Sequence, residues 1–121
     1  MRVLVVDDDI IIRHYFVRSL RRHVDVEEAS GVMPALAKIH ALPFDIVITD
    51  EHMPDGSGRT LLAQVRMLQA HCRRILMSGN DVHLEASDVH ERFFAKAGGL
   101  TQLVAWVCAV ASEARAKRAP H

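Results

Sequence analysis

Two short apolar segments of this chain each run directly into aspartate, and this feature constrains the fold more than any other. The first segment, Val3–Val6, leads into Asp7–Asp9, and the second, Asp45–Thr49, leads into Asp50. Both are rich in β-branched residues, as expected of parallel strands that are buried on both faces. If the strands are neighbours, their carboxylates meet at one edge of the sheet. Like charges repel there unless a cation lies among them.

The rest of the chain alternates between strand-like and helix-like patterns. Short apolar or alternating runs predict further strands over residues 24–29, 74–78 and 92–96. Apolar positions three or four residues apart predict helices over residues 10–23, 31–42, 59–70 and 100–117. Strands that alternate with helices in this way indicate an α/β fold with a parallel sheet that is covered by helices on both faces.

The bulk composition excludes several classes of protein. The 121 residues suit one domain, and 15 basic residues balance 15 acidic ones, so no basic surplus argues for direct binding of nucleic acid. The apolar runs are too short to span a membrane, and Met1 leaves no room for a signal peptide before the first strand. Cys72 and Cys108 fit neither a zinc pattern nor a disulfide framework, so reduced thiols are expected. We therefore predict a cytoplasmic protein, with a tail over residues 114–121 that is prone to fray.

Several of the predicted strands end in a charged or reactive residue. These residues are Asp7 with Asp8, Asp50, Ser78 and Lys96. In an open parallel sheet, ligands bind beyond the carboxyl ends of the strands. Clustered carboxylate oxygens suit Mg²⁺, a carboxylate can attack phosphorus, and a lysine with a metal ion neutralises the charge of a transferred phosphoryl group. The strand ends therefore indicate phosphoryl chemistry.

The motifs at these strand ends resemble those of a response-regulator receiver domain of two-component and phosphorelay signalling. In chain order they are Val6–Asp9, Asp50 followed by Met53–Gly58, Met77–Gly79 and Phe93–Lys96. Each motif alone is weak, but together they are specific, and they cover essentially the whole chain. The resemblance implies a flavodoxin-like (βα)5 fold with the sheet order 2-1-3-4-5. It also implies a single receiver domain over residues 1–121 with no output domain.

The resemblance further implies roles for the residues of the carboxylate cluster. Asp50 is implied as the phosphoacceptor, which takes a phosphoryl group from a phosphohistidine of a sensor histidine kinase or a histidine phosphotransfer protein. Asp8 and Asp50 are implied to bind Mg²⁺ directly, and Asp7 mainly through water. The backbone carbonyl of His52 is implied as a further metal ligand, whereas its side chain is more typical of an exposed loop histidine.

Residues on the last two strands are implied to act on the phosphoryl group itself. Ser78 takes the position of a hydroxyl that moves toward this group, and Lys96 takes the position of an amine that pairs with it. Phe93 takes the position of a switch aromatic, where tyrosine is common, although a plain core phenylalanine is the alternative. Such a protein catalyses only its own phosphorylation and dephosphorylation and is not otherwise an enzyme.

Two features depart from the family pattern. Ala97 follows Lys96 where proline is usual, and a cis bond before a residue other than proline costs about 3 kcal/mol. We therefore predict a trans bond or a strained cis one, with Gly98 and Gly99 absorbing the difference. Only 17 residues separate Ser78 from Lys96, fewer than is usual in the family, so the fourth helix is expected to be short or irregular.

Two surfaces are candidates for contact with protein partners. On the first helix, a partly apolar face with a basic rim resembles the face with which receivers dock their phosphodonors; it comprises Ile11, Tyr15, Arg18 and Arg22. Ordinary surface residues are the alternative reading. Trp106 lies off the apolar stripe of the last helix, and there an exposed tryptophan would indicate a face for a downstream partner or a homodimer. A buried tryptophan would indicate packing alone.

Two other functions compete with a receiver that is switched by phosphate. The first is an interaction module that keeps the receiver fold but is not phosphorylated, which Ala97 and the short region before Phe93 favour. Against it, a site without function has no reason to keep carboxylates that repel each other. The second is an aspartate-nucleophile phosphatase, which usually needs a second aspartate two residues after the nucleophile. His52 occupies that position here.

Overall fold

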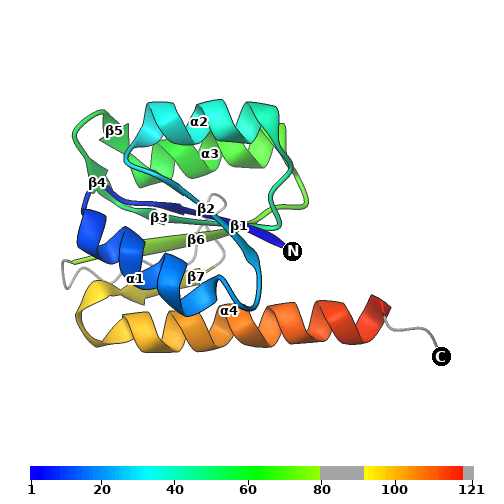
Figure 1. Ribbon diagram of the computed structural model, residues 1–121. Coiled ribbons are helices and arrows are strands. Elements are labelled where there is room, and N and C mark those ends of the chain that lie inside the picture. Colours follow the sequence, from blue (N-terminus) through cyan, green and yellow to red (C-terminus); the bar gives the residue numbers. More distant parts are fainter. Residues whose placement is uncertain (80–91, 119–121) are drawn as a thin grey trace.

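Five parallel strands form a central sheet between two layers of helices (Figure 1). The computed structural model describes residues 1–79 and 92–118. The strands of the sheet are β1 (Arg2–Val6), β2 (Asp25–Ala29), β3 (Ile46–Asp50), β6 (Arg73–Ser78) and β7 (Arg92–Ala95). They lie in the order β2-β1-β3-β6-β7, and each neighbouring pair is parallel, as the resemblance implied. The strand order reverses between β1 and β3, which is where open sheets of this kind bind ligands.

Helices cover both faces of the sheet, as predicted. One face is covered by α2 (Val32–Ala41) and α3 (Gly58–Leu68), and the other by α1 (Ile10–Leu20) and α4 (Lys96–Arg118) (Figure 1). Alternate residues of β1 face the two layers. Leu4 and Val6 pack under α2 and α3, whereas Val3 and Val5 pack against α1 and α4. All four side chains are fully buried, which explains why this strand is an unbroken apolar run.

The first helix begins directly after the aspartate run. The side chain of Asp9 accepts a hydrogen bond from the backbone N–H of Ile11 at 2.9 Å, so Asp9 is the N-cap. Phe16 and Leu20 bury the inner face of α1. The helix ends at Leu20, earlier than predicted. The N–H of Val24 donates to the carbonyl of Leu20, the Val24 side chain is buried, and β2 begins at the next residue.

The loop predicted after β3 contains a small hairpin. β4 (His52–Met53) and β5 (Gly56–Ser57) form an antiparallel pair that lies outside the main sheet. Strands of two residues leave no periodic signal in a sequence, so their pattern reads as a loop. Gly56 has a φ of 151°, a backbone conformation that favours glycine.

The last helix is longer than predicted at both ends. α4 begins at Lys96, the residue predicted to end the fifth strand, and Gly98 has a φ of 81°. Gly98 therefore makes the first turn irregular instead of separating strand from helix. At the other end α4 continues to Arg118, one residue beyond the predicted end; whether residues 114–118 fray stays a prediction. Residues 119–121 lie outside the described part of the chain.

The peptide bond between Lys96 and Ala97 is trans, which is the first of the two predicted alternatives. No cis bond occurs within residues 1–79 and 92–118. The stretch 80–91, where a short or irregular fourth helix was expected, lies outside the described residues. That prediction therefore stays a prediction.

Cys72 and Cys108 are not joined by a disulfide, in line with the expected reduced thiols. Cys72 is buried and Cys108 is partly buried. Cys72 directly precedes β6 and lies after the end of α3. Among the helices that the structure describes, none is long and apolar enough to cross a membrane.

Candidate functional site

The predicted carboxylate cluster lies at the carboxyl edge of β1 and β3. Asp50 is the last residue of β3, and Asp7 and Asp8 directly follow β1. One carboxylate oxygen from each of the three residues lies within 4.8 Å of the other two. Asp7 and Asp50 are buried, whereas Asp8 is exposed. The cluster therefore has a buried floor and one side that is open to solvent.

Lys96 partly neutralises this cluster from the first turn of α4. Its Nζ lies 2.7 Å from Oδ2 of Asp7 and 3.3 Å from Oδ1 of Asp50. This ammonium is the one polar contact of the buried Asp7 Oδ2 within the described residues. Burial by itself lowers the pKa of Lys96, but the hydrogen bonds and charges of Asp7 and Asp50 outweigh it and raise that pKa. Lys96 is therefore held in its charged form.

The negative charge of Asp50 is less fully neutralised by Lys96 than that of Asp7. Burial raises the pKa of Asp50 and the charge of Asp7 raises it further, while Lys96 opposes both effects without cancelling them. The geometry explains the difference, since the ammonium lies closer to Asp7 than to Asp50. The ionised carboxylate of Asp50 thus destabilises the protein when no further cation is present.

Asp50→Asn is expected to raise the free energy of unfolding at pH 7, in the presence of a metal chelator, by about 1 kcal/mol. A carboxyl group whose folded-state pKa is raised contributes stability at low pH and loses it as the pH rises through that pKa. The advantage of the variant should therefore disappear when the wild type is protonated, as the pH falls below the ordinary aspartate pKa of 3.8. Urea unfolding at a series of pH values measures both effects. A variant less stable than the wild type at pH 7 would contradict this account.

The donor set of the cluster fits Mg²⁺. Asp7, Asp8 and Asp50 offer only oxygen ligands, and Mg²⁺ binds carboxylate oxygens while it keeps several waters. The exposed side of the cluster at Asp8 gives room for those waters. The buried Oδ2 of Asp7 has one close partner, Lys96 Nζ at 2.7 Å, and a carboxylate oxygen can accept a second bond, for example from a metal-bound water. We therefore expect Asp8 and Asp50 to hold the ion, with Asp7 behind them.

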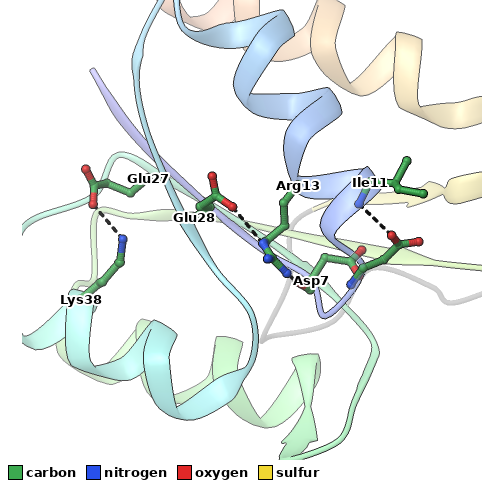
Figure 2. Close-up of polar contacts among 7 residues, drawn as sticks. Asp7, Ile11, Arg13, Glu27, Glu28 and Lys38 are labelled. Carbon is green, nitrogen blue, oxygen red and sulfur yellow. Dashed lines mark hydrogen bonds and ion pairs between the residues drawn. The ribbon is translucent and has the colours of Figure 1, made fainter.

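Arg13 holds Asp7 in place, and it was not among the residues predicted for the site. Its Nη1 donates to the backbone oxygen of Asp7 at 2.7 Å, and its Nε donates to Oε1 of Glu28 on β2 at 2.9 Å (Figure 2). The backbone N–H of Asp9 donates to Oδ1 of Asp7 at 2.9 Å. The main chain and the side chain of Asp7 are therefore both fixed. An arginine one turn into a helix is too common in sequences to indicate this role.

Asp55 joins the β4–β5 hairpin to the start of α2. Its two carboxylate oxygens accept hydrogen bonds from the backbone N–H groups of Val32 and Met33, each at 2.9 Å. Hydrogen bonds from Met33 and Val32 lower the pKa of Asp55. The N-cap of α2 is Gly31, which has no side chain to cap the helix, and a Cβ there would press against the Asp55 carboxylate. Because glycine cannot cap a helix with its own side chain, Gly31 is the one sequence signal that another residue caps α2.

Asp55→Ala is expected to weaken Mg²⁺ binding by about tenfold, because the hairpin that carries the His52 carbonyl loses its attachment to α2. Asp45→Ala is a matched control. It also removes a carboxylate that accepts a backbone hydrogen bond, from Arg2 N at 2.7 Å, but it does so at the opposite end of β3. Calorimetric titration with Mg²⁺ compares the two variants, and equal affinities would contradict the prediction.

Gly58 brings the start of α3 against the backbone of Asp50. Its N–H donates to the carbonyl of Glu51 at 2.8 Å, and the N–H of Glu51 donates to the carbonyl of Met77 at 3.0 Å. Arg59 Nε also pairs with Glu51 Oε2 at 3.1 Å. A Cβ on Gly58 would overlap the carbonyl oxygen of Asp50. The backbone that follows Asp50 is therefore anchored from both α3 and β6.

Of the remaining predicted site residues, Ser78 and His52 lie at or just beyond the same edge of the sheet, and Phe93 lies further back along β7. Ser78 ends β6, is buried, and pairs in register with Ala95, which precedes Lys96. His52 begins β4 with its side chain exposed. The backbone of Phe93 belongs to β7, but its side chain lies outside the described residues. The switch at Phe93 therefore stays a prediction.

The predicted partner face on α1 contains a hollow. The lining residues include Ile11, Tyr15 and Arg18, and the hollow has a volume of about 530 Å³. The Ile11 side chain is 74% exposed although it is apolar. Arg22 does not line this hollow. The hollow therefore covers part of the predicted face, with an apolar residue beside a cation, while Arg22 is exposed beyond the end of α1.

Trp106 is packed against the protein. It is partly buried and contacts the core layer of α1 and α4. Its ring centroid lies 6.4 Å from that of Phe94, and the guanidinium groups of Arg73 and Arg92 lie 4.7 Å and 5.4 Å from its ring centroid. These contacts favour the packing alternative for Trp106 over an exposed partner face.

The family model of the response regulator receiver domain matches residues 3–104 of the chain. The two-component response regulator ARR2 of Arabidopsis thaliana is 39% identical over 85 residues, which are 67% of this chain and 12% of that protein. ARR14 of the same plant is 33% identical over 81 residues, which are 64% of this chain and 21% of that protein. The chain thus spans less than a quarter of the length of these curated relatives.

Solved response regulators share the fold over most of this chain. TrrA of Thermotoga maritima, in complex with Mg²⁺–BeF, is 25% identical with a TM-score of 0.77, over 88% of this chain and 95% of that chain. A response regulator of Burkholderia pseudomallei with a phosphorylated aspartic acid and a calcium ion is 27% identical with a TM-score of 0.77. That match covers 98% of this chain and 72% of the other.

Proposed function

This chain belongs to the response regulator receiver domain family, and from this premise we propose that Asp50 accepts a phosphoryl group in a Mg²⁺-dependent reaction. Receiver domains of two-component signalling accept phosphate on an aspartate. The proposed donor is a phosphohistidine of a sensor histidine kinase or a histidine phosphotransfer protein. The signal is proposed to pass on by protein–protein contact or by phosphorelay.

The position of Asp50 among the other charged groups is the observation that carries this proposal. Asp7 and Asp8 follow β1, Asp50 ends β3, and Lys96 begins α4, so three separate segments bring these groups together. Two buried carboxylates and a single nearby ammonium leave a site that attracts further positive charge. Such an arrangement destabilises the protein unless a cation binds among the carboxylates.

In the proposed step, an oxygen of the Asp50 carboxylate forms a bond to phosphorus while the bond between phosphorus and the imidazole nitrogen of the donor breaks. The electron pair of the broken bond stays on the imidazole. The Lys96 ammonium, 3.3 Å from Asp50 Oδ1, is placed to neutralise charge on the phosphoryl group. Ser78, buried at the end of β6, is proposed to donate a hydrogen bond to it. Bound Mg²⁺ supplies further charge neutralisation and a position for a phosphoryl oxygen.

The hollow on α1 is proposed to receive the phosphodonor. Helix α1 starts at Ile10, two residues after Asp8, so its exposed first turn lies beside the carboxylate cluster. Ile11 offers an apolar contact there, and Arg18 lies further along the same hollow. A helix of the donor that packs along α1 would therefore bring its histidine toward Asp50.

Incubation with acetyl phosphate and Mg²⁺, followed by intact mass measurement, tests the proposal. The wild type should gain one phosphoryl group, and it should gain none in the presence of a metal chelator. Asp50→Asn should gain none, whereas Asp45→Asn, at the other end of the same strand, should be labelled like the wild type. Labelling of Asp50→Asn would assign the reaction to another residue. An unlabelled wild type that also fails to bind Mg²⁺ would instead favour a receiver-fold interaction module that is not switched by phosphate.

A further inference from the structure

Arg13 links the carboxylate cluster to the edge of the sheet. Its Nη1 donates to the backbone oxygen of Asp7 at 2.7 Å, and its Nε donates at 2.9 Å to Oε1 of Glu28, on the edge strand β2 (Figure 2). The Arg13 side chain is 13% exposed, so it is largely enclosed by the protein. One guanidinium therefore bridges the end of β1 and the outermost strand of the sheet.

The contact from Arg13 acts on the peptide unit between Asp7 and Asp8. The oxygen that accepts from Nη1 is the carbonyl of Asp7, and because a peptide unit is planar, holding this oxygen also restricts the nitrogen and Cα of Asp8. The Asp7 carboxylate is held separately, by the N–H of Asp9 at Oδ1 and by Lys96 at Oδ2. Arg13 therefore sets the direction in which Asp8 follows the strand.

Asp8 depends on its backbone for its position in the cluster. Its side chain is exposed, and its carboxylate has no hydrogen bond or ion pair with any residue that the structure describes. A carboxylate that no other side chain orients is placed by the main chain on either side of it. On one side this is the peptide that Arg13 holds, and on the other it is Asp9, the N-cap of α1.

We infer that Arg13 is a positioning residue for Mg²⁺ and that it directs the Asp8 carboxylate through the peptide that precedes it. Glu28 in turn keeps the Arg13 guanidinium in place. This inference rests on the proposed Mg²⁺ site. Residues that orient a metal ligand without touching the ion typically change metal affinity by about 10–100-fold when they are lost. Lysine cannot replace Arg13 fully, because a single ammonium lacks the rigid fork of donors that reaches two separate acceptors.

The charge of Arg13 and its positioning role predict opposite effects on metal binding. A cation beside the carboxylates repels Mg²⁺, so by charge alone its removal would tighten binding. If Arg13 positions Asp8, its removal weakens binding instead. The pair of Lys38 and Glu27 is a matched control, because it also joins a cation on a helix to β2, at 3.0 Å (Figure 2). The Lys38 ammonium contacts this carboxylate and no backbone atom of the site.

Calorimetric titration with Mg²⁺ tests the inference, with urea unfolding in a chelator as the check that each variant is folded. Arg13→Met should bind Mg²⁺ about tenfold more weakly than the wild type, and Arg13→Lys should recover only part of the loss. Lys38→Met should keep the affinity of the wild type. Glu28→Ala removes a partly exposed side chain and leaves Arg13 in the protein, so it should weaken binding by about threefold. Glu27→Ala, at the next position of the same strand, should not.

Backbone order parameters from nuclear magnetic resonance give a readout without metal. In the presence of a chelator, the order parameter of the Asp8 N–H should fall from about 0.85 in the wild type to below about 0.6 in Arg13→Met. In Lys38→Met it should stay at the wild-type value. This measurement reports the position of the Asp8 backbone itself, whether or not Mg²⁺ is bound.

An Arg13→Met variant that binds Mg²⁺ as tightly as the wild type, or more tightly, would overturn the inference. Full recovery in Arg13→Lys, an equal loss in Lys38→Met, or an unchanged order parameter of Asp8 in Arg13→Met would overturn it as well. Failure of the proposed function gives a different result. A wild type that binds Mg²⁺ but is not labelled by acetyl phosphate would contradict phosphorylation of Asp50, while the weaker Mg²⁺ binding of Arg13→Met would still support the positioning role.

Discussion

Lys96→Met is expected to lower the free energy of unfolding at pH 7, without Mg²⁺, by about 2–3 kcal/mol. The lost ammonium lies 2.7 Å from Asp7 Oδ2 and 3.3 Å from Asp50 Oδ1. Removing one partner of a buried ion pair leaves an uncompensated charge, which costs about 3–5 kcal/mol when the pair is fully buried. The expected loss is smaller here because the Lys96 side chain is 21% exposed and Asp50 can take up a proton. Urea unfolding measures the difference.

The effect of Lys96→Met should depend on pH in a defined direction. The pKa of Lys96 is raised above its ordinary value of 10.5, so its contribution to stability is present below that value and is lost only as the pH rises through the folded-state pKa. In the variant, Asp7 and Asp50 no longer have this cation. Its stability should therefore recover toward that of the wild type as acid protonates the carboxylates. A variant as stable as the wild type at pH 7 would show that Lys96 does not neutralise the cluster.

Lys38→Met is the matched control for this experiment. Lys38 also pairs with a carboxylate, Glu27, at 3.0 Å, but the two side chains are 36% and 38% exposed. Exposed ion pairs contribute less than about 1 kcal/mol, so this variant should lose little stability.

Mg²⁺ should stabilise Lys96→Met more than the wild type, because a bound cation takes over the neutralisation that the lysine supplied. Acetyl phosphate should label Lys96→Met at least about tenfold more slowly than the wild type.

The central strands could be predicted because their burial leaves a direct mark on the sequence. A strand such as β1 or β3, covered by helices on both faces, is apolar along most of its length, and few other structures produce such runs. The helices that cover the sheet leave a periodic mark for the same reason. Element ends were less predictable. The end of α1 depends on the burial of Val24 in the core, and the first turn of α4 holds Lys96 beside the distant residues Asp7 and Asp50.

The acidic part of the site could be predicted from sheet topology alone. Once β1 and β3 are neighbouring parallel strands, Asp7 and Asp50 must meet, whatever the loops do. The residues that position them could not be predicted in this way. Arg13 reaches Asp7 across a helical turn, and Asp55 caps a helix that begins 23 residues earlier in the chain. Such contacts depend on which loops approach each other, and no local pattern encodes that approach.

Gly58→Ala is expected to lower the free energy of unfolding by about 2–4 kcal/mol, which is large for the addition of one methyl group. The added Cβ would overlap the backbone carbonyl oxygen of Asp50 and approach the side chain of Thr49. Neither neighbour can move easily. Asp50 belongs to a central strand, and the Thr49 hydroxyl donates to the Asp50 carbonyl at 3.0 Å in a fully buried position. The start of α3 must therefore shift away from β3.

The same shift should weaken Mg²⁺ binding by about tenfold, because Gly58 N–H anchors the carbonyl of Glu51 between Asp50 and His52. Gly79→Ala is the matched control: Gly79 directly follows β6 at the same edge of the sheet, but a Cβ there meets nothing within 4 Å among residues 1–79 and 92–118. Urea unfolding and calorimetric titration with Mg²⁺ should separate the two variants. If both kept the stability and the Mg²⁺ affinity of the wild type, the close contact between α3 and Asp50 would not hold the phosphoacceptor in place. If Gly58→Ala lost stability but kept its Mg²⁺ affinity, the contact would support the fold without positioning the metal ligands.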